Sequence, residues 1–240
     1  MSRLNALGQP IGEALPDWTP PPAPPHAPLQ GAWARLEPLS LAAHGDDLWE
    51  AVQLDPEGRT WTWMSHGPFA DRAALDAVLA GYEASSDPLF FAVRASASGR
   101  VEGLMSLMRI TPAAGTIEVG NIWWGPAMQK TPTATQTIRL LMELVFSLGY
   151  RRLEWKCDHL NAASRKAAMR FGFSYEGVFR QALVYKGRTR DTAWYACIDS
   201  EWPALQAAYD RWLDPENFDA EGRQKTSLAE LTAPILVARG

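Results

Sequence analysis

The residues of this sequence best placed to do chemistry lie between Thr116 and Phe173. An apolar strand pattern ends at Gly125-Pro126 and leads into the turn Gln129 to Ala134, where Thr131 can cap a helix and Pro132 suits its first position. A helix that begins this way offers free backbone amides and the positive end of its dipole. The pattern therefore favours an anion such as a pyrophosphate at this turn; the alternative is a plain helix start that binds no ligand.

The elements on both sides of the turn must hold it in place. The helix after Pro132 puts apolar residues on one face and stops at Gly149, and the segment 151–158 then returns as a strand. Two strands joined by a helix run parallel. The turn is thus expected beside the ends of two parallel strands, at Trp124 and Asp158. The apolar helix residues are Ile138, Leu141, Val145 and Leu148, and the strand alternates Leu153, Trp155 and Cys157 with Glu154 and Lys156.

The chain before Thr116 predicts the order strand, helix, helix, strand, strand. Helices are expected at 42–53 and at about 70–82, and a hairpin turns at Ser98-Gly99. A Pro/Gly turn at 111–115 adds the strand 116–124, which gives an antiparallel meander. The predicted class is mixed α/β. After residue 198 we expect a helix at 201–213 and then a tail with one short helix.

Composition predicts one domain with two tails. The chain has 240 residues, of which 47% are apolar and 21% charged, and 8 of its 18 prolines lie in residues 1–30. The expected division is an extended arm (1–30), the domain (31–213) and a C-terminal tail (214–240). A net charge of -4 predicts neither nucleic acid nor an anionic membrane as partner.

The two cysteines, Cys157 and Cys197, lack metal-ligand spacing and are expected to be core thiols. No metal is expected. No apolar run reaches about 18 residues and the N-terminus lacks an apolar signal core, so the expected location is the cytosol (cytoplasmic).

Residues 32–213 resemble the GNAT N-acetyltransferases. Gln129 to Ala134 is similar to that family's Gln/Arg-x-x-Gly-x-Gly/Ala turn, and Asn161 and Phe171-Gly172-Phe173 stand at the spacing of its Asn-to-Gly-Phe helix. The segment 176–203 is similar to the closing hairpin of the branch that contains the ribosomal-protein alanine and serine N-acetyltransferases. The resemblance implies a GNAT fold: a mixed, mostly antiparallel sheet of six to seven strands, splayed between two parallel strands, with helices on both faces.

The resemblance also implies acetyl-CoA as co-substrate. Its pantetheine arm is expected between the two parallel strands and its pyrophosphate on the amides of the turn. Pro132 departs from the family's glycine and has no amide to donate. Either a neighbouring amide or the Thr133 hydroxyl replaces it, or the affinity for the cofactor is lower. The implied cofactor residues are Ile122, Trp123, Trp124, Gln129, Lys130, Thr131, Thr133, Ala134, Asn161, Ser164 and Arg165. Arg165, Lys166 and Arg170 form a basic helix edge, and for Arg165 or Lys166 the alternative to phosphate binding is a solvated helix face.

Transfer of an acetyl group to an amine needs a base, because an alkylammonium is almost wholly protonated at pH 7. By analogy with related transferases we assign this role to Glu118; the alternative is a strand carboxylate paired with a nearby cation. The tyrosine found in many relatives is replaced by Ala168, so Ser164 is the candidate donor to the cofactor's sulfur, or is simply a first-turn helix hydroxyl.

The sequence thus predicts an N-acetyltransferase that acts on a small-molecule amine or on a protein N-terminus, as a monomer or homodimer. A catalytically weak or inactive acyl-CoA-binding module is the alternative, because of Pro132 and Ala168. Asp191 either forms a salt bridge with Arg190 or faces the substrate, and the salt bridge is the preferred interpretation. Four tryptophans are candidates for an aromatic wall of the acceptor site or for core packing: Trp61, Trp63, Trp123 and Trp124.

Overall fold

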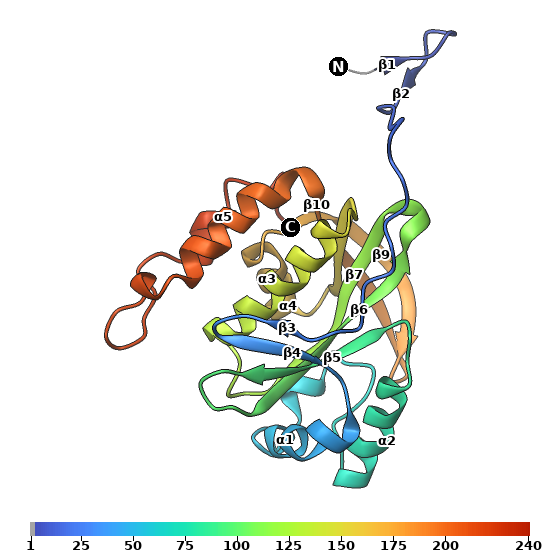
Figure 1. Ribbon diagram of the computed structural model, residues 1–240. Helices are drawn as coiled ribbons and strands as arrows, with labels where there is room; N and C mark the ends of the chain where they lie inside the picture. Colours follow the sequence, from blue (N-terminus) through green and yellow to red (C-terminus); the bar gives the residue numbers. More distant parts are fainter. Residues whose placement is uncertain (1–2) are drawn as a thin grey trace.

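A computed structural model describes residues 3–240 as one large sheet with helices on both faces and two extended ends (Figure 1). The helices are α1 (Leu41–Gln53), α2 (Arg72–Glu83), α3 (Pro132–Ser147), α4 (Ala162–Arg170), α5 (Trp202–Leu213) and α6 (Leu228–Thr232). The strands of the large sheet are β3 (Leu29–Gln30), β4 (Ala34–Pro38), β5 (Leu89–Ala95), β6 (Val101–Thr111), β7 (Thr116–Trp124), β8 (Arg152–Asp158), β9 (Ser174–Tyr185) and β10 (Arg188–Ile198). None of the helices in this described part is long and apolar enough to cross a membrane.

The sheet has the order β3-β4-β5-β6-β7-β8-β10-β9, and every neighbouring pair is antiparallel except β7 and β8. This confirms the predicted mixed fold, the meander and the single parallel pair. Eight strands are present where six to seven were expected. The additional edge strand, β3, comes from the proline-rich arm, whose two residues pair with Leu36 and Arg35 of β4.

The parallel pair separates before either strand ends. β7 and β8 are paired from Thr116 opposite Arg152 to Val119 opposite Trp155, after which β7 continues to Trp124 and β8 to Asp158. The register between β6 and β7 shifts beside Asn121, which has a positive φ of 49°. A bulge bends its strand and changes its twist. β7 therefore turns away from β8, and a gap opens between the ends of the two strands.

The core lies on both faces of the sheet. On one face Ile138, Leu141 and Val145 of α3 are buried against the strands, as the helical spacing predicted. On the other face Leu48 of α1 and Leu75 of α2 are buried. Each helix buries one apolar stripe, which holds the strands and the turn before α3 in fixed positions.

The two ends of the chain behave differently. Pro21 and Pro24 are buried, and the imidazole Nε2 of His26 lies 2.7 Å from the carbonyl oxygen of Phe90, so the second half of the arm packs on the body. The first half projects from it as the small hairpin of β1 (Arg3–Leu4) and β2 (Pro10–Ile11) (Figure 1). At the other end, α6 packs against α5, and its Leu228 is fully buried.

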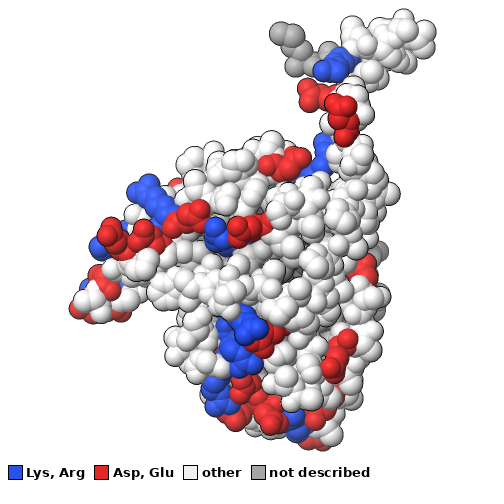
Figure 2. All heavy atoms as spheres, viewed as in Figure 1, with Lys and Arg blue, Asp and Glu red and all other residues white. Residues whose placement is uncertain are grey.

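Charges are mixed over the face shown in Figure 2. Acidic and basic side chains gather together along α5 and around the end of the molecule that holds α1 and α2, while much of the centre of this face is uncharged. Such a surface has no large field of one sign.

Candidate functional site

Two cavities meet at the gap between β7 and β8. The larger, of about 930 Å³, lies on the side of the α3 N-terminus. The smaller, of about 470 Å³, lies over the strand residues Glu118 and Lys156. Both volumes are in the range of small-molecule sites. Six residues line both cavities, namely Thr60, Trp63, Ile122, Trp155, Asn161 and Ser164.

The larger cavity is built around the turn that the sequence singled out. Thr131 is the N-cap of α3: its hydroxyl accepts from the amide of Ala134 at 3.5 Å and donates to the carbonyl of Met128 at 2.7 Å. Lys130 has a positive φ of 62°, so the turn is tight. Ala134 and Thr135 of the first turn of α3 line this cavity, so the positive end of the helix dipole lies beside it. This is the expected anion site.

Pro132 is the first residue of α3, where its missing amide costs the helix nothing. The Thr133 hydroxyl donates to the carbonyl of Trp33 at 3.1 Å, and the residue does not line the cavity. The hydroxyl therefore does not replace the missing amide. A neighbouring amide, or a lower affinity for the cofactor, remains as the consequence of Pro132.

Arg170 was placed by the sequence on a basic helix edge, without a role in phosphate binding. Both of its terminal nitrogens donate to the Thr135 hydroxyl, at 3.1 and 3.2 Å, and the guanidinium lies over the rings of Phe171 and Trp212. Burial lowers the pKa of Arg170. Among residues 3–240, no carboxylate lies within 4 Å of it. A partly buried guanidinium at the start of a helix, with no counter-ion, is suited to a phosphate.

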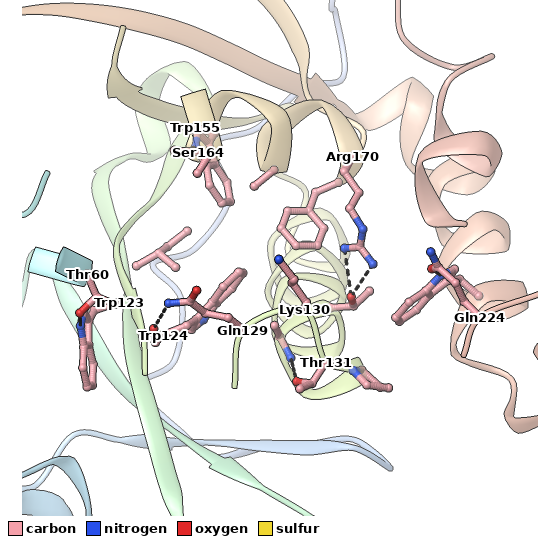
Figure 3. A pocket seen from close by; sticks show the side chains of 18 of the residues that line it. Thr60, Trp123, Trp124, Gln129, Lys130, Thr131, Trp155, Ser164, Arg170 and Gln224 are labelled. Atoms are coloured by element: carbon pink, nitrogen blue, oxygen red, sulfur yellow. Dashed lines mark hydrogen bonds between the residues drawn. The ribbon is translucent and has the colours of Figure 1, made fainter. Parts of the chain in front are cut away.

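Figure 3 shows the arrangement of this cavity. Trp124 and Gln129 lie on one side of it and Arg170 and Gln224 on the other, with Lys130 and Thr131 between them. The amide of Gln129 donates to the carbonyl of Trp124 at 3.0 Å. The C-terminal segment contributes Gln224, together with Phe218, Gly222 and Arg223. No local motif in the sequence marks these tail residues.

The junction of the cavities is formed by Asn161 and Ser164. The Asn161 side chain caps α4 by accepting from the Ser164 amide at 3.0 Å through Oδ1, which leaves its NH₂ group for another partner. The Ser164 hydroxyl accepts from the indole of Trp155 at 3.0 Å. A hydroxyl that accepts one hydrogen bond still has its own proton to donate. Ser164 can therefore donate into the gap.

Glu118 lies at the floor of the smaller cavity and is only 3% exposed. Its Oε2 is 2.5 Å from Nη1 of Arg109 and 2.9 Å from Nζ of Lys156. Among the residues described, no hydrogen bond or ion pair involves its Oε1. Glu118 is therefore paired with nearby cations through Oε2, as the alternative interpretation predicted, and its Oε1 remains free to contact a substrate.

The loop between α1 and α2 also lines the smaller cavity. It contributes Thr60, Trp63, Met64 and Ser65. The hairpin of β9 and β10 holds this loop, because Nζ of Lys186 donates to the carbonyl of Trp61 at 2.8 Å. Of the four candidate tryptophans, Trp63 and Trp124 are partly exposed and line cavities, and the buried Trp123 also borders the larger cavity. The indoles of Trp61 and Trp123 stack in the core, 4.6 Å between centroids.

Two further sequence expectations have an outcome here. The pairing of Asp191 with Arg190 is wrong: Asp191 accepts from the amide of Gln181 at 2.7 Å, where the β9–β10 register shifts, and so holds a bulge in place. Cys157 and Cys197 are buried free thiols, as expected.

The structure brings most of the predicted cofactor residues to one cavity and leaves two outside it. Thr133 points to Trp33, and Arg165 donates to the hydroxyl of Tyr195 at 3.3 Å; neither lines the larger cavity. The position of Ala168 is fully buried. The predicted cofactor residues that line the larger cavity are Ile122, Trp123, Trp124, Gln129, Lys130, Thr131, Ala134, Asn161 and Ser164.

Comparison with known proteins agrees with this geometry. Residues 34–174 match the sequence model of the Acetyltransferase (GNAT) domain. A GCN5-related N-acetyltransferase from Brucella melitensis is similar at 50% identity, over 91% of this chain and 100% of that one, with a TM-score of 0.89. A probable GNAT-family acetyltransferase from Chromobacterium violaceum is similar at 38% identity, over 82% and 98% of the two chains, with a TM-score of 0.75.

A more distant likeness concerns the fold alone. The Salmonella typhimurium acetyltransferase that modifies the N-terminal serine of ribosomal protein L7/L12 is 20% identical over 70% of this chain and 96% of that one, with a TM-score of 0.60. No curated protein sequence matches the chain.

Proposed function

This chain belongs to the GNAT acetyltransferase family, and from that membership we propose that it moves an acetyl group from acetyl-CoA to a primary amine by direct attack on the thioester. One observation carries the proposal. The cavity with the phosphate-binding features and the cavity with the carboxylate meet at Ser164, in the gap between β7 and β8. Only at this junction can an amine in the smaller cavity contact a thioester in the larger one.

The residues of the larger cavity fit the cofactor. The N-terminal end of α3, with Lys130 and Arg170, would hold phosphate groups, and the side-chain NH₂ of Asn161 would donate to a pantetheine carbonyl. The indole nitrogen of Trp124 is buried and has no hydrogen-bond partner within the described chain, although the residue lines this cavity. A ligand in the cavity could accept this hydrogen bond. Bound acetyl-CoA would supply the activated acetyl group.

The residues of the smaller cavity would prepare the amine. Oε1 of Glu118 accepts a proton from the incoming ammonium, directly or through water, while Arg109 and Lys156 keep the carboxylate in place through Oε2. Ser164 donates its hydroxyl proton toward the sulfur as the bond to the acetyl group breaks. The buried Trp155 indole fixes the direction of that hydroxyl.

Direct attack is favoured over a cysteine intermediate. Cys157 lines the smaller cavity and is the only cysteine near the junction among the described residues. Burial raises the pKa of its thiol. Since the thiolate is the nucleophilic form, this cysteine is poorly suited to carry the acetyl group.

The acceptor is either a small-molecule amine or a protein N-terminus. The shared fold of the Salmonella enzyme, which acts on a protein N-terminus, is consistent with the second class. The volume of the smaller cavity, about 470 Å³, is that of a small-molecule site and favours the first.

The test is incubation with labelled acetyl-CoA and separate libraries of amines and peptides, together with calorimetry of CoA binding. We expect micromolar or tighter CoA binding and label transfer to at least one amine class. CoA binding without transfer to any acceptor would support the noncatalytic alternative, in which thioester hydrolysis is the same in the wild type and in Glu118→Gln. Absence of CoA binding would contradict both.

A further inference from the structure

We propose that the acceptor is an amine that also carries a carboxylate, an apolar or aromatic amino acid, and that Arg190 binds this carboxylate inside the smaller cavity. The inference rests on the proposed function, whose amine site it deepens. Three neighbouring donors on β10 have no hydrogen-bond partner among residues 3–240.

Arg190, Thr192 and Trp194 follow one another at every second position of β10, so their side chains share a face of the sheet, and all three line the smaller cavity. Nε of Arg190, Oγ1 of Thr192 and Nε1 of Trp194 are buried, and none has a hydrogen-bond partner in residues 3–240. The Thr192 side chain is only 5% exposed. A buried donor left unpaired is costly, because it has lost its hydrogen bonds to water. Three in one cavity indicate a ligand with acceptor oxygens.

The ion pairs of this cavity leave Arg190 as the free cation. Its lining holds three cations, Arg109, Lys156 and Arg190, and two carboxylates, Glu118 and Asp158. Arg109 and Lys156 both pair with Glu118, and Lys156 also pairs with Glu154. Within the described residues no carboxylate lies within 4 Å of Arg190. A planar guanidinium without a carboxylate partner matches the carboxylate of a ligand.

The surroundings of Arg190 place it in the same cavity as the end of β8. Its neighbour Asp191 accepts a hydrogen bond from the amide of Gln181, so the expected partner is engaged elsewhere. The guanidinium lies 5.9 Å from the ring centroid of Tyr185, whose hydroxyl donates to Asp158 at 2.9 Å. Asp158 is the last residue of β8, and both Asp158 and Arg190 line the smaller cavity.

The remaining lining defines the body of the ligand. Trp63, Phe179, Leu183 and Trp194 give the cavity apolar walls, and the ring of Trp194 is occupied on one side by Nζ of Lys156, 3.7 Å from its centroid. An amino acid with an apolar or aromatic side chain would place its amine toward Glu118 and the gap, its carboxylate on Arg190 and its side chain against these walls. A polyamine would meet the free guanidinium with a like charge.

The test compares matched pairs of acceptors that differ only in the carboxylate: phenylalanine with phenethylamine, tryptophan with tryptamine, and leucine with isoamylamine. Transfer is followed by release of free CoA, and binding to the CoA-loaded protein by calorimetry. We expect kcat/KM and affinity to be about 10- to 100-fold higher for at least one acid than for its amine. Arg190→Gln should bring that ratio close to one, Arg190→Lys should retain part of it, and Thr192→Val should lower it less.

The matched control is Arg188→Gln, which removes the same charge from an exposed position of the same strand that does not line the cavity. It should keep the acid-to-amine ratio. Equal or better use of the amines, absence of binding of every acid, or an unchanged ratio in Arg190→Gln would overturn the inference. Loss of CoA binding is a separate result that would refute the proposed function. Acids that bind without being acetylated would support the carboxylate site and contradict only the transfer.

Discussion

At the scale of single residues, Arg170 has a role that its position in the chain does not reveal. It is the last residue of α4, yet it lies against Thr135 in the first turn of α3. The protein keeps this guanidinium beside aromatic rings without a carboxylate partner among the described residues. The desolvation of an unpaired cation is offset when a phosphate binds.

We predict that Arg170→Gln weakens CoA binding about 10- to 100-fold, because a charged hydrogen bond contributes about 1.5–3 kcal/mol. Calorimetric titration with CoA measures this. The control is Lys166→Gln, which removes a charge from an exposed position of the same helix and should change the Kd less than about twofold. Equal affinity of Arg170→Gln and wild type would exclude Arg170 from the phosphate site.

Glu118 is the residue on which catalysis depends in the proposed mechanism. Glu118→Gln should lower kcat by about 10²- to 10⁴-fold, the usual contribution of a general base, and leave the Kd for CoA unchanged. Steady-state kinetics and calorimetry separate the two effects.

Glu154→Gln is the matched control for this prediction. Glu154 contacts the same Lys156, 2.6 Å away, but does not line the acceptor cavity. Its loss should lower kcat less than about tenfold. Equal losses in the two variants would show that Lys156 and its ion pairs, and not the Glu118 carboxylate, are required.

At the scale of elements, ionic contacts join β4, β5 and α1 on the side of the sheet away from the site. Glu37 of β4 accepts two hydrogen bonds from Arg94 of β5, at 3.0 and 3.1 Å, and its Oε2 is 2.8 Å from His44 of α1. Mainly through Arg94, these contacts lower the pKa of Glu37 from 4.5 to about 2. The folded state thus releases this proton more readily than the unfolded state.

A lowered carboxyl pKa stabilises the fold fully above pH ~4.5, and this contribution is lost as the pH falls through about 2. We predict that Glu37→Gln costs on the order of 2–3 kcal/mol of unfolding free energy at pH 6 and much less at pH 2.5. Urea unfolding at both values measures it. Glu57→Gln, at an exposed carboxylate, should cost less than about 0.5 kcal/mol at either pH. A cost for Glu37→Gln that does not depend on pH would contradict the linkage.

Bulges are the other feature at this scale. One beside Asn121 turns β7 away from β8, and one between Arg190 and Thr192 is held by Asp191. Each lies directly at a cavity, where a regular ladder would have closed the sheet. The site is therefore a consequence of local interruptions of pairing.

At the scale of the whole molecule, the C-terminal segment is part of the core. Leu228 of α6 is fully buried, the hydroxyl of Thr232 donates to the carbonyl of Arg170 at 3.1 Å, and Gln224 lines the larger cavity. The segment after α5 thus supports the end of α4 from which Arg170 projects. By contrast, Leu7 of the N-terminal hairpin is 82% exposed.

We predict that Leu228→Ala destabilises the protein by about 2–4 kcal/mol, through lost apolar contact and the cavity left behind. Leu7→Ala, the same change at an exposed position, should stay within about 0.5 kcal/mol of wild type. Urea unfolding compares the two, and CoA titration of folded Leu228→Ala tests the support of Arg170. Equal stability of the two variants would show that α6 does not contribute to the core.

The sequence by itself determined the order of elements, the parallel pair and the cap of α3. These depend on near neighbours: Thr131 caps Ala134, Pro132 occupies the first helical position, and a helix between two strands makes them parallel. It also identified Asn161 and Ser164, which share one helix start. The eighth strand escaped prediction, because a pair of residues in a proline-rich arm has no period.

Only the tertiary structure decided which distant side chains share a cavity. It joined Arg170 to Thr135, brought Gln224 and Phe218 to the cofactor side, and turned Thr133 and Arg165 elsewhere. It also separated Asp191 from Arg190, because a bulge gave the carboxylate a backbone amide as partner. Adjacent residues of a strand point to opposite faces, and long side chains choose among partners that packing brings near. The local sequence pattern therefore does not determine which distant partner a long side chain contacts.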